Sequence, residues 1–320
     1  MNAINTDKNV QLTYGGLKSS TDTSGADYTI IGIPFDIRTT YRPGTRFGPD
    51  EIRRAFSTDS MNEAVGIDTG KYVKGVDYGN LDIWNAEKAY LGSIPQEMKA
   101  ILETGTVPIV LGGDHSITFP ELLAYKDVYG PVSIIHFDSH TDTWGSDTDK
   151  EHHDHSTPFR RAIEYGCIDP KTSIQVGMRG GLSDESDFDF ANNAGLAHIY
   201  AVDIHHMGIE KTAELIREKV GNNKVVVTFD IDFVDPAFAP GTGTPVSCGF
   251  TSRQALELIR HTLIGLDIVG FDLVEVAPNY DAGGITSILA SRIVKEFITC
   301  VACKKAGIIE YAKKGMIENV

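Results

Sequence analysis

The sequence lacks long apolar stretches and has few cysteines, and these absences exclude several classes of protein. No apolar run in the 320 residues reaches the roughly 18 that span a membrane. The first twenty residues have neither the basic segment nor the apolar segment of a secretory leader. Four cysteines are too few for a disulfide framework in a chain of this length. We therefore expect a cytoplasmic protein.

Positive charge is also scarce. Lys and Arg total 29 against 44 Asp and Glu, which gives a formal net charge of -15. Such a charge repels nucleic acid and anionic membrane surfaces, so we expect neither as a partner. Cys300 and Cys303 share one face of an expected helix, and we expect small buried residues there rather than a zinc or redox site.

Short runs rich in Val and Ile recur along the chain, and helical patterns such as 93–105 and 210–221 lie between them. Strands that alternate with helices are typical of a parallel sheet covered on both faces. We expect an N-terminal arm at 1–27 and a single α/β domain at 28–320. The expected strands cover residues 28–36, 107–114, 132–140, 172–180, 224–232 and 268–276.

Acidic and histidine side chains gather at the carboxyl ends of these runs, where open parallel sheets bind their ligands. We expect Asp36 and Asp114 to cap their own turns. We expect the other acidic and histidine side chains at these strand ends to converge on one crevice. The full set is Asp36, Asp114, His115, Asp138, His140, Asp142, Asp230, Asp232 and Glu275.

The segment DSHTD at 138–142 suggests a metal site. In an extended chain, alternate residues point the same way, so Asp138, His140 and Asp142 share one side. The same rule pairs Asp230 with Asp232, and His115 follows a tight Gly turn. These residues could be ordinary turn caps, but an uncompensated cluster of this density would cost several kcal/mol, so we expect cations.

Oxygen and nitrogen ligands without a thiolate favour Mn²⁺, with Ni²⁺, Co²⁺ and Zn²⁺ as alternatives. Six ligands are too many for one catalytic ion that keeps an open position. They suit two ions about 3.5–4 Å apart, an arrangement typical of hydrolases.

Four segments, in order, resemble the signature segments of the ureohydrolase family, which contains arginase, agmatinase and guanidinobutyrase. They are GGDHSIT, HFDSHTDT, TFDIDFVDPAFAPGTGTP and GFDLVEVAPNYD, and GTRFGPDEIR precedes them. The resemblance covers about residues 28–310. It implies a three-layer α/β/α sandwich with an eight-stranded parallel sheet, assembled as a homotrimer or homohexamer. A hetero-oligomer with a paralogous subunit stays open.

The resemblance also implies roles for the residues. A hydroxide between two metal ions attacks the guanidinium carbon, and urea and an amine leave. Asp142 passes on a proton, and Glu275 pairs with the guanidinium nitrogens; an ordinary ion pair is the alternative for Glu275. The implied ligands are His115, Asp138, Asp142 and Asp230 for the first ion, and Asp138, His140, Asp230 and Asp232 for the second.

Histidines near this cluster receive different predictions. His155 stands where agmatinases have a proton-shuttling His-Gly segment, although Ser156 replaces the Gly. We expect His152 and His153 to be solvated loop residues, and His136 to be buried and supporting.

The substrate stays open between several guanidino compounds. No Asn follows the DSHTDTW segment as it does in arginases, which disfavours arginine, while other segments point to agmatinase and guanidinobutyrase alike. Ser139 and Trp144 are candidate substrate-binding residues, and Trp144 could stack on a guanidinium or simply pack. A small or alkylated guanidine or a biguanide is also possible. Arg179 could contact an acidic tail or form a salt bridge.

Two alternatives have a different function. One is a formimino- or acyl-amine amidohydrolase on the same fold. The other is a non-catalytic partner subunit, although all six expected metal ligands are present. Arg160 and Arg161 begin an expected helix, where an ion pair or a subunit contact is the simplest account.

Overall fold

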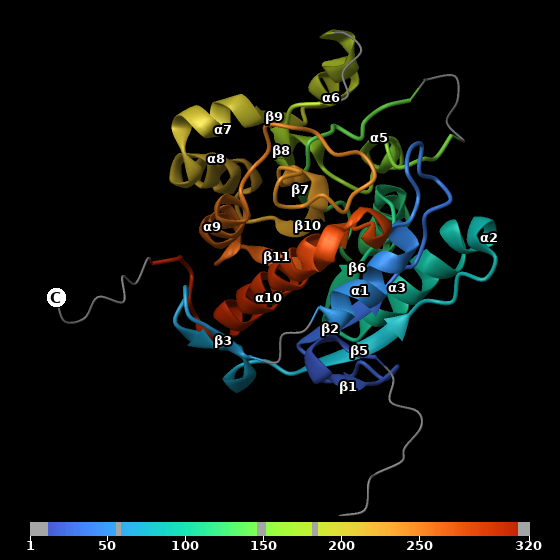
Figure 1. Ribbon diagram of the computed structural model, residues 1–320, viewed down its shortest axis with the longest axis vertical. Coiled ribbons are helices and arrows are strands. Elements are labelled where there is room, and N and C mark those ends of the chain that lie inside the picture. The colour runs from blue at the N-terminus through green and yellow to red at the C-terminus, as the bar shows by residue number, and fades with distance from the viewer. Residues whose placement is uncertain (1–11, 56–58, 146–151, 181–184, 313–320) are drawn as a thin grey trace, which may run out of the picture.

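Nine parallel strands form the centre of the computed structural model, which describes residues 12–55, 59–145, 152–180 and 185–312. Their order across the sheet is β1-β5-β2-β6-β11-β10-β7-β8-β9, and Figure 1 shows their arrangement. The strands are β1 (Lys18–Ser19), β2 (Tyr28–Gly32), β5 (Gly75–Asn80), β6 (Val107–Leu111), β7 (Ser133–Phe137), β8 (Ile174–Met178), β9 (Ala197–Tyr200), β10 (Lys224–Asp230) and β11 (Asp267–Val274). A separate antiparallel pair joins β3 (Met61–Asn62) to β4 (Ile67–Asp68).

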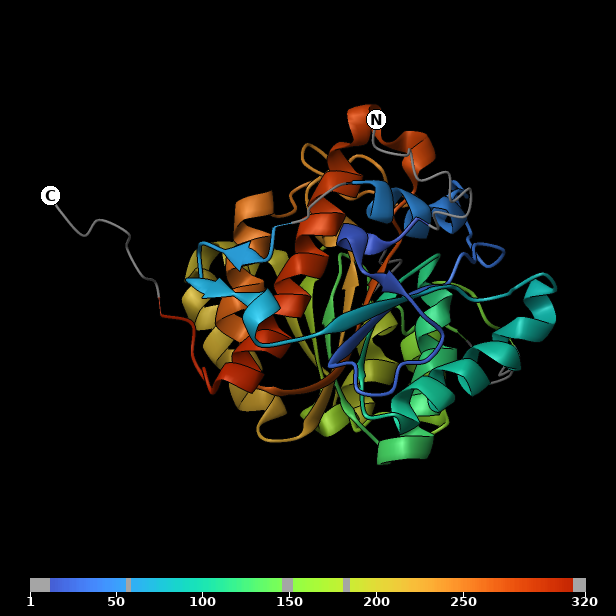
Figure 2. The same ribbon diagram turned by 90° about the horizontal axis from the view of Figure 1, so that it is seen from below.

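Helices cover both faces of this sheet because successive strand residues point to opposite sides. In β2, for example, Ile30 packs into one hydrophobic cluster and Ile31 into the other. Figure 2 shows the two helical layers with the sheet between them. One layer contains α1 (Gly48–Arg54), α7 (Ala201–Met207), α8 (Ile209–Val220), α9 (Ser252–Leu263) and α10 (Ile285–Ala306). The other contains α2 (Ala86–Tyr90), α3 (Ser93–Glu103), α4 (Thr118–Tyr129) and α5 (Pro158–Glu164). The short α6 (Asp189–Ala194) precedes β9.

The predicted three-layer α/β/α architecture is confirmed, with one more strand than the eight expected. The sheet includes the two-residue β1, which pairs with β5 at one edge. This edge strand lies within the predicted N-terminal arm, and the nearby Tyr14 hydroxyl donates a hydrogen bond to the Ser291 carbonyl at 2.7 Å. Residues 12–27 therefore lie against the domain, while residues 1–11 are outside the described part. No helix in the described ranges is long and apolar enough to cross a membrane.

Four neighbouring strands carry the candidate site at their carboxyl ends. The strands β6, β11, β10 and β7 lie side by side, and the predicted polar residues follow directly after each of them. The turn after β6 depends on Gly113, because a side chain there would collide with the Phe35 carbonyl oxygen. This turn carries His115 to the same edge as Asp138, Asp230 and Glu275.

Candidate metal centre and substrate pocket

Short turns fix the side chains at this edge of the sheet. Asp114 caps a 3-10 turn at His115–Ile117 by accepting the Ser116 N–H at 3.0 Å. Asp36 accepts the Gly44 N–H at 2.9 Å. The turn-capping role predicted for Asp114 is therefore confirmed, whereas Asp36 holds a more distant part of its loop, at Gly44, and pairs with Arg46.

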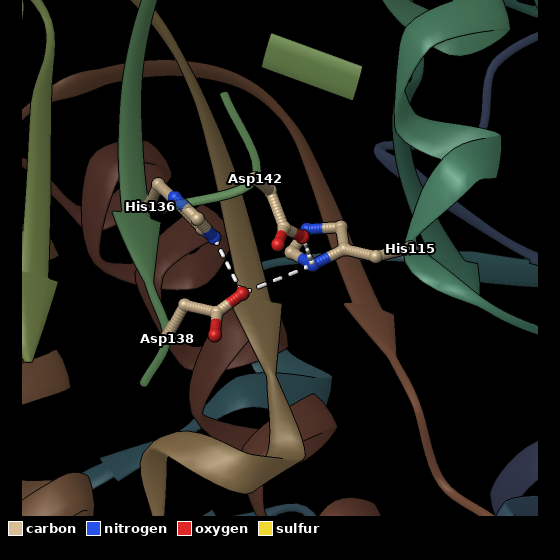
Figure 3. Close-up of side chains that lie close together, drawn as sticks. All are labelled: His115, His136, Asp138 and Asp142. Atoms are coloured by element: carbon tan, nitrogen blue, oxygen red, sulfur yellow. Dashed lines mark hydrogen bonds and ion pairs between the residues drawn. The ribbon is translucent and has the colours of Figure 1, made fainter. Parts of the chain in front are cut away.

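His115 lies at the centre of the first group of possible metal ligands. Its Nδ1 is 3.1 Å from Asp138 Oδ2, 3.0 Å from Asp142 Oδ2 and 3.3 Å from Asp230 Oδ2. Figure 3 shows His115, Asp138 and Asp142 pointing toward one another. This nitrogen is buried and has no hydrogen-bond partner among the described residues. A lone pair surrounded by carboxylate oxygens fits a divalent cation.

The second group shares Asp138 with the first. His140 Nδ1 is 3.4 Å from Asp138 Oδ1 and 3.0 Å from Asp232 Oδ2. Asp138 therefore presents one oxygen to each group, as a bridging carboxylate does. Asp230 and Asp232 are fixed together, because Asp230 Oδ1 accepts the Asp232 N–H at 2.7 Å. The structure thus brings all six predicted metal ligands into one cluster.

The cluster contains more negatively charged groups than positively charged ones. Burial raises the pKa of Asp230 well above its usual range, and the charges of Asp232 and Asp138 raise it further. Burial would lower the pKa of His115, but Asp138, Asp142 and Asp230 raise it well above the ordinary value. Four carboxylates in one buried cluster carry the formal charge that two divalent cations would neutralise.

The backbone at this site is also unusual. Asp142 and Glu275 have φ angles of 49° and 62°, in the left-handed region that residues with a side chain seldom adopt. Such conformations gather at functional sites, where the surrounding structure holds them in place.

Glu275 and His155 interact at the wall of the pocket. Glu275 Oε1 accepts the His115 N–H at 2.9 Å and contacts His155 Nδ1 at 2.9 Å. Its Oε2 is buried and has no hydrogen-bond partner among the described residues. Glu275 therefore has a free carboxylate oxygen for a cationic group.

Thr40, which the sequence interpretation did not single out, positions the other side of the His155 ring. Its N–H points to His155 Nε2 at 3.1 Å, and its hydroxyl oxygen is 2.7 Å away. Burial would lower the pKa of His155, but Glu275 raises it to about 9. The raised pKa favours a protonated ring at neutral pH, whereas the main-chain N–H of Thr40 needs a lone pair on Nε2 and fits the neutral ring with its proton on Nδ1. Glu275 and Thr40 thus favour opposite protonation states of this ring. Protonation of Nε2 would break the contact with Thr40.

A cavity of about 400 Å³ opens beside these residues. Trp144 lines it, and its contact with a substrate stays a prediction. Ser139 is buried and donates its hydroxyl to Asp232 Oδ1 at 2.7 Å, so its observed contact is with a possible metal ligand. The residues along the cavity are Thr40, His140, Asp142, Trp144, Asp154, His155, Ser156, Asp230, Thr244 and Glu275.

The other histidines of this region differ in burial. His136 is buried as predicted, and its Nε2 is 2.7 Å from Asp138 Oδ2. His152 is exposed as predicted. The prediction for His153 was wrong, because its ring is buried and stacks on Phe119 with a centroid distance of 5.4 Å. The apolar side of the imidazole packs well against an aromatic ring from α4.

The remaining predicted side chains have structural contacts. Arg179 donates to the carbonyl oxygens of Asp232 and Val246 at 2.6 and 3.0 Å, and it forms no salt bridge with the described residues. Arg160 pairs with Glu164 at 3.1 Å, and Arg161 pairs with the same glutamate. Cys300 and Cys303 are free thiols buried along α10.

Comparisons with known proteins agree with this geometry. The model of the arginase family matches residues 26–300. Proclavaminate amidinohydrolase of Streptomyces clavuligerus is 41% identical over 280 residues, which cover 86% of this chain and 88% of the relative. Guanidinobutyrase of Pseudomonas aeruginosa is 39% identical, with 89% of each chain covered. A crystal structure of a hypothetical agmatinase from Burkholderia thailandensis superposes with a TM-score of 0.84 and 37% identity, over 93% of this chain and 92% of that one.

Proposed function

The chain belongs to the arginase family of metal-dependent amidinohydrolases, and we propose that it hydrolyses a guanidino compound with a neutral or positively charged tail to urea and an amine. The observation that carries this proposal is the buried Asp and His cluster beside a pocket lined by Glu275. Glu275, which has the unpartnered oxygen, lines the same cavity as His140, Asp142 and Asp230 of the cluster. A guanidinium paired with Glu275 would therefore sit next to the metal ligands.

The six ligands suit two divalent ions, for which we propose Mn²⁺ first and Ni²⁺ as the alternative, since the donors are nitrogen and oxygen only. When bound, such a pair activates water as the nucleophile and stabilises developing negative charge.

Three side chains along the pocket would serve the rest of the reaction. Glu275 orients the guanidinium by a charge-assisted hydrogen bond from its free oxygen. Asp142 lines the cavity beside the cluster, where its carboxylate could pass a proton from the nucleophile to the departing amine. His155 would exchange that proton with solvent, since it contacts Glu275 and faces the cavity.

The charge of the pocket supports the proposed kind of tail. Its described lining includes Asp154 in addition to the carboxylates near the cluster, and it contains no Lys or Arg. Burial would raise the pKa of Asp154, but hydrogen bonds from Ser156 and His152 lower it, so this carboxylate is charged at neutral pH. An acidic tail would face this negative charge without a cationic partner. Amine-tailed or alkylated guanidines, including biguanides, avoid that repulsion.

A substrate pair with tails of similar length and opposite charge tests the proposal. Purified protein loaded with Mn²⁺ or Ni²⁺ would be given agmatine, 4-guanidinobutyrate, guanidine and methylated guanidines, and urea would be measured. We expect a higher kcat/KM for agmatine or an alkylated guanidine than for 4-guanidinobutyrate. A preference for the acid would overturn the assignment of the tail. Formamide, ammonia or a carboxylic acid in place of urea would favour the formimino- or acyl-amine alternative.

The assembly and location of the protein are also proposed. We expect a homotrimer or homohexamer in the cytoplasm, which light scattering on the purified protein would test for the oligomer. A chain that binds metal but releases urea only after mixing with a paralogue would instead support a hetero-oligomer.

A further inference from the structure

Gln175 is a polar residue inside β8. Its side-chain amide contacts two groups of the segment 136–141, which includes the end of the neighbouring strand β7. Its Nε2 donates a hydrogen bond to the Thr141 carbonyl oxygen and lies 2.9 Å from His136 Nδ1. Gln175 and His136 are register partners in the parallel strands β8 and β7, and both are fully buried. The three groups are therefore held in one fixed arrangement.

The Thr141 carbonyl settles which way the amide points. A carbonyl oxygen can only accept, so the Gln175 atom that faces it must be the amide nitrogen. Turning the amide over would set two oxygens against each other. Gln175 Oε1 has no hydrogen-bond partner in the described part of the chain, so no other contact favours the turned amide.

This orientation determines the tautomer of His136. The second hydrogen of the Gln175 amide points to His136 Nδ1, which must therefore carry a lone pair. The ring proton is then on Nε2, which donates to Asp138 Oδ2 at 2.7 Å. Figure 3 shows the contacts from His136 and His115 meeting at this same Asp138 oxygen.

The tautomer has a consequence for the metal centre. His136 Nε2 lies among the possible ligand atoms, but a nitrogen that carries a proton cannot bind a cation. Its N–H instead occupies one lone pair of Asp138 Oδ2 and fixes the direction of the other. Asp138 Oδ1 is fixed separately, because it accepts the His140 N–H at 2.6 Å. Both oxygens of the bridging carboxylate are thus oriented by hydrogen bonds.

We propose that Gln175 is a positioning residue for the metal centre: it sets the tautomer of His136, which in turn holds Asp138 in the orientation that binds both ions. This inference rests on the metal site of the proposed function, but it does not depend on the substrate. Partners that orient a metal ligand typically change metal affinity by 10- to 100-fold when they are removed.

The test compares Mn²⁺ affinity, without substrate, in wild-type protein and two variants. Gln175→Met has a similar volume but no donor, so we expect the dissociation constant for Mn²⁺ to rise 10- to 100-fold. Gln254→Met is the control, because Gln254 caps α9 and does not line the pocket. It should leave the Mn²⁺ affinity unchanged. Unchanged affinity in folded Gln175→Met would overturn the inference.

A neutron crystal structure of the wild-type protein is the second measurement. It tests the inference even if the Gln175→Met variant does not fold. We expect a deuteron on His136 Nε2 and none on Nδ1. A deuteron on Nδ1, or Mn²⁺ bound directly to Nε2, would overturn the inference. Wild-type protein that binds Mn²⁺ with this tautomer but releases no urea would refute the proposed function alone.

Discussion

Replacing Glu275 with glutamine is expected to lower kcat/KM for urea release about 10- to 150-fold while leaving the bound metal unchanged. Glu275 is almost fully buried, and its Oε2 has no hydrogen-bond partner among the described residues. A guanidinium bound there would gain a charge-assisted hydrogen bond, which contributes about 1.5–3 kcal/mol. Since about 1.36 kcal/mol corresponds to a tenfold change in rate, its loss gives this range.

The assay should separate this effect from loss of metal or fold. Urea release gives kcat/KM, elemental analysis gives the metal per chain, and circular dichroism gives the fold. Glu97→Gln is the matched control, because Glu97 lies in α3 and accepts the Tyr78 hydroxyl at 2.7 Å away from the pocket lining. Unchanged kcat/KM in a folded, metal-replete Glu275→Gln variant would refute the reasoning.

Three further predictions concern the metal ligands, stability and the substrate tail. Asp232→Ala should abolish turnover and reduce the metal content from two ions to one, with the fold retained in circular dichroism; full activity of the metal-replete variant would contradict the two-ion assignment. Burial and the neighbouring Asp272 raise the pKa of Glu121 well above its usual range. Above the ordinary pKa of about 4.3, the folded state therefore binds more protons than the unfolded state. The free energy of unfolding falls as pH rises, by up to about 1.4 kcal/mol per pH unit. The melting temperature of Glu121→Gln minus that of the wild type should therefore increase from pH 5 to pH 8. A difference that does not change with pH would contradict a buried proton on Glu121. Asp154→Asn should raise KM for agmatine several-fold more than KM for guanidine, which has no tail; equal changes would remove Asp154 from tail recognition.

The central strands could be predicted from the sequence because they are buried on both faces and read as continuous apolar runs. Other strands lack that pattern. Most residues of β5 are half-buried or exposed, and β9 is short, with one buried residue. The two residues of β1 are both exposed. These strands lie at or near the edges of the sheet, where one face or end is open to solvent and no long apolar run is needed.

The cluster of carboxylates and imidazoles could be predicted because the alternation in DSHTD places two aspartates and a histidine on one side of the chain. Thr40 and Gln175 could not be assigned in this way, since their roles depend on contacts between distant segments. Thr40 is 115 positions from His155, and Gln175 is 34 from Thr141. The one local signal for Gln175 is a polar side chain within an otherwise apolar strand. His153 was misassigned because the aromatic rings around it come from other elements.

The hydrolysis of a guanidino group at a two-ion centre is tested most directly by measuring urea and amine together from one substrate. Metal-replete protein given agmatine or an alkylated guanidine should release one urea for each amine. Chelation should stop the release, and added Mn²⁺ or Ni²⁺ should restore it. Ammonia in place of urea, or urea release that persists after both ions are removed, would contradict the account.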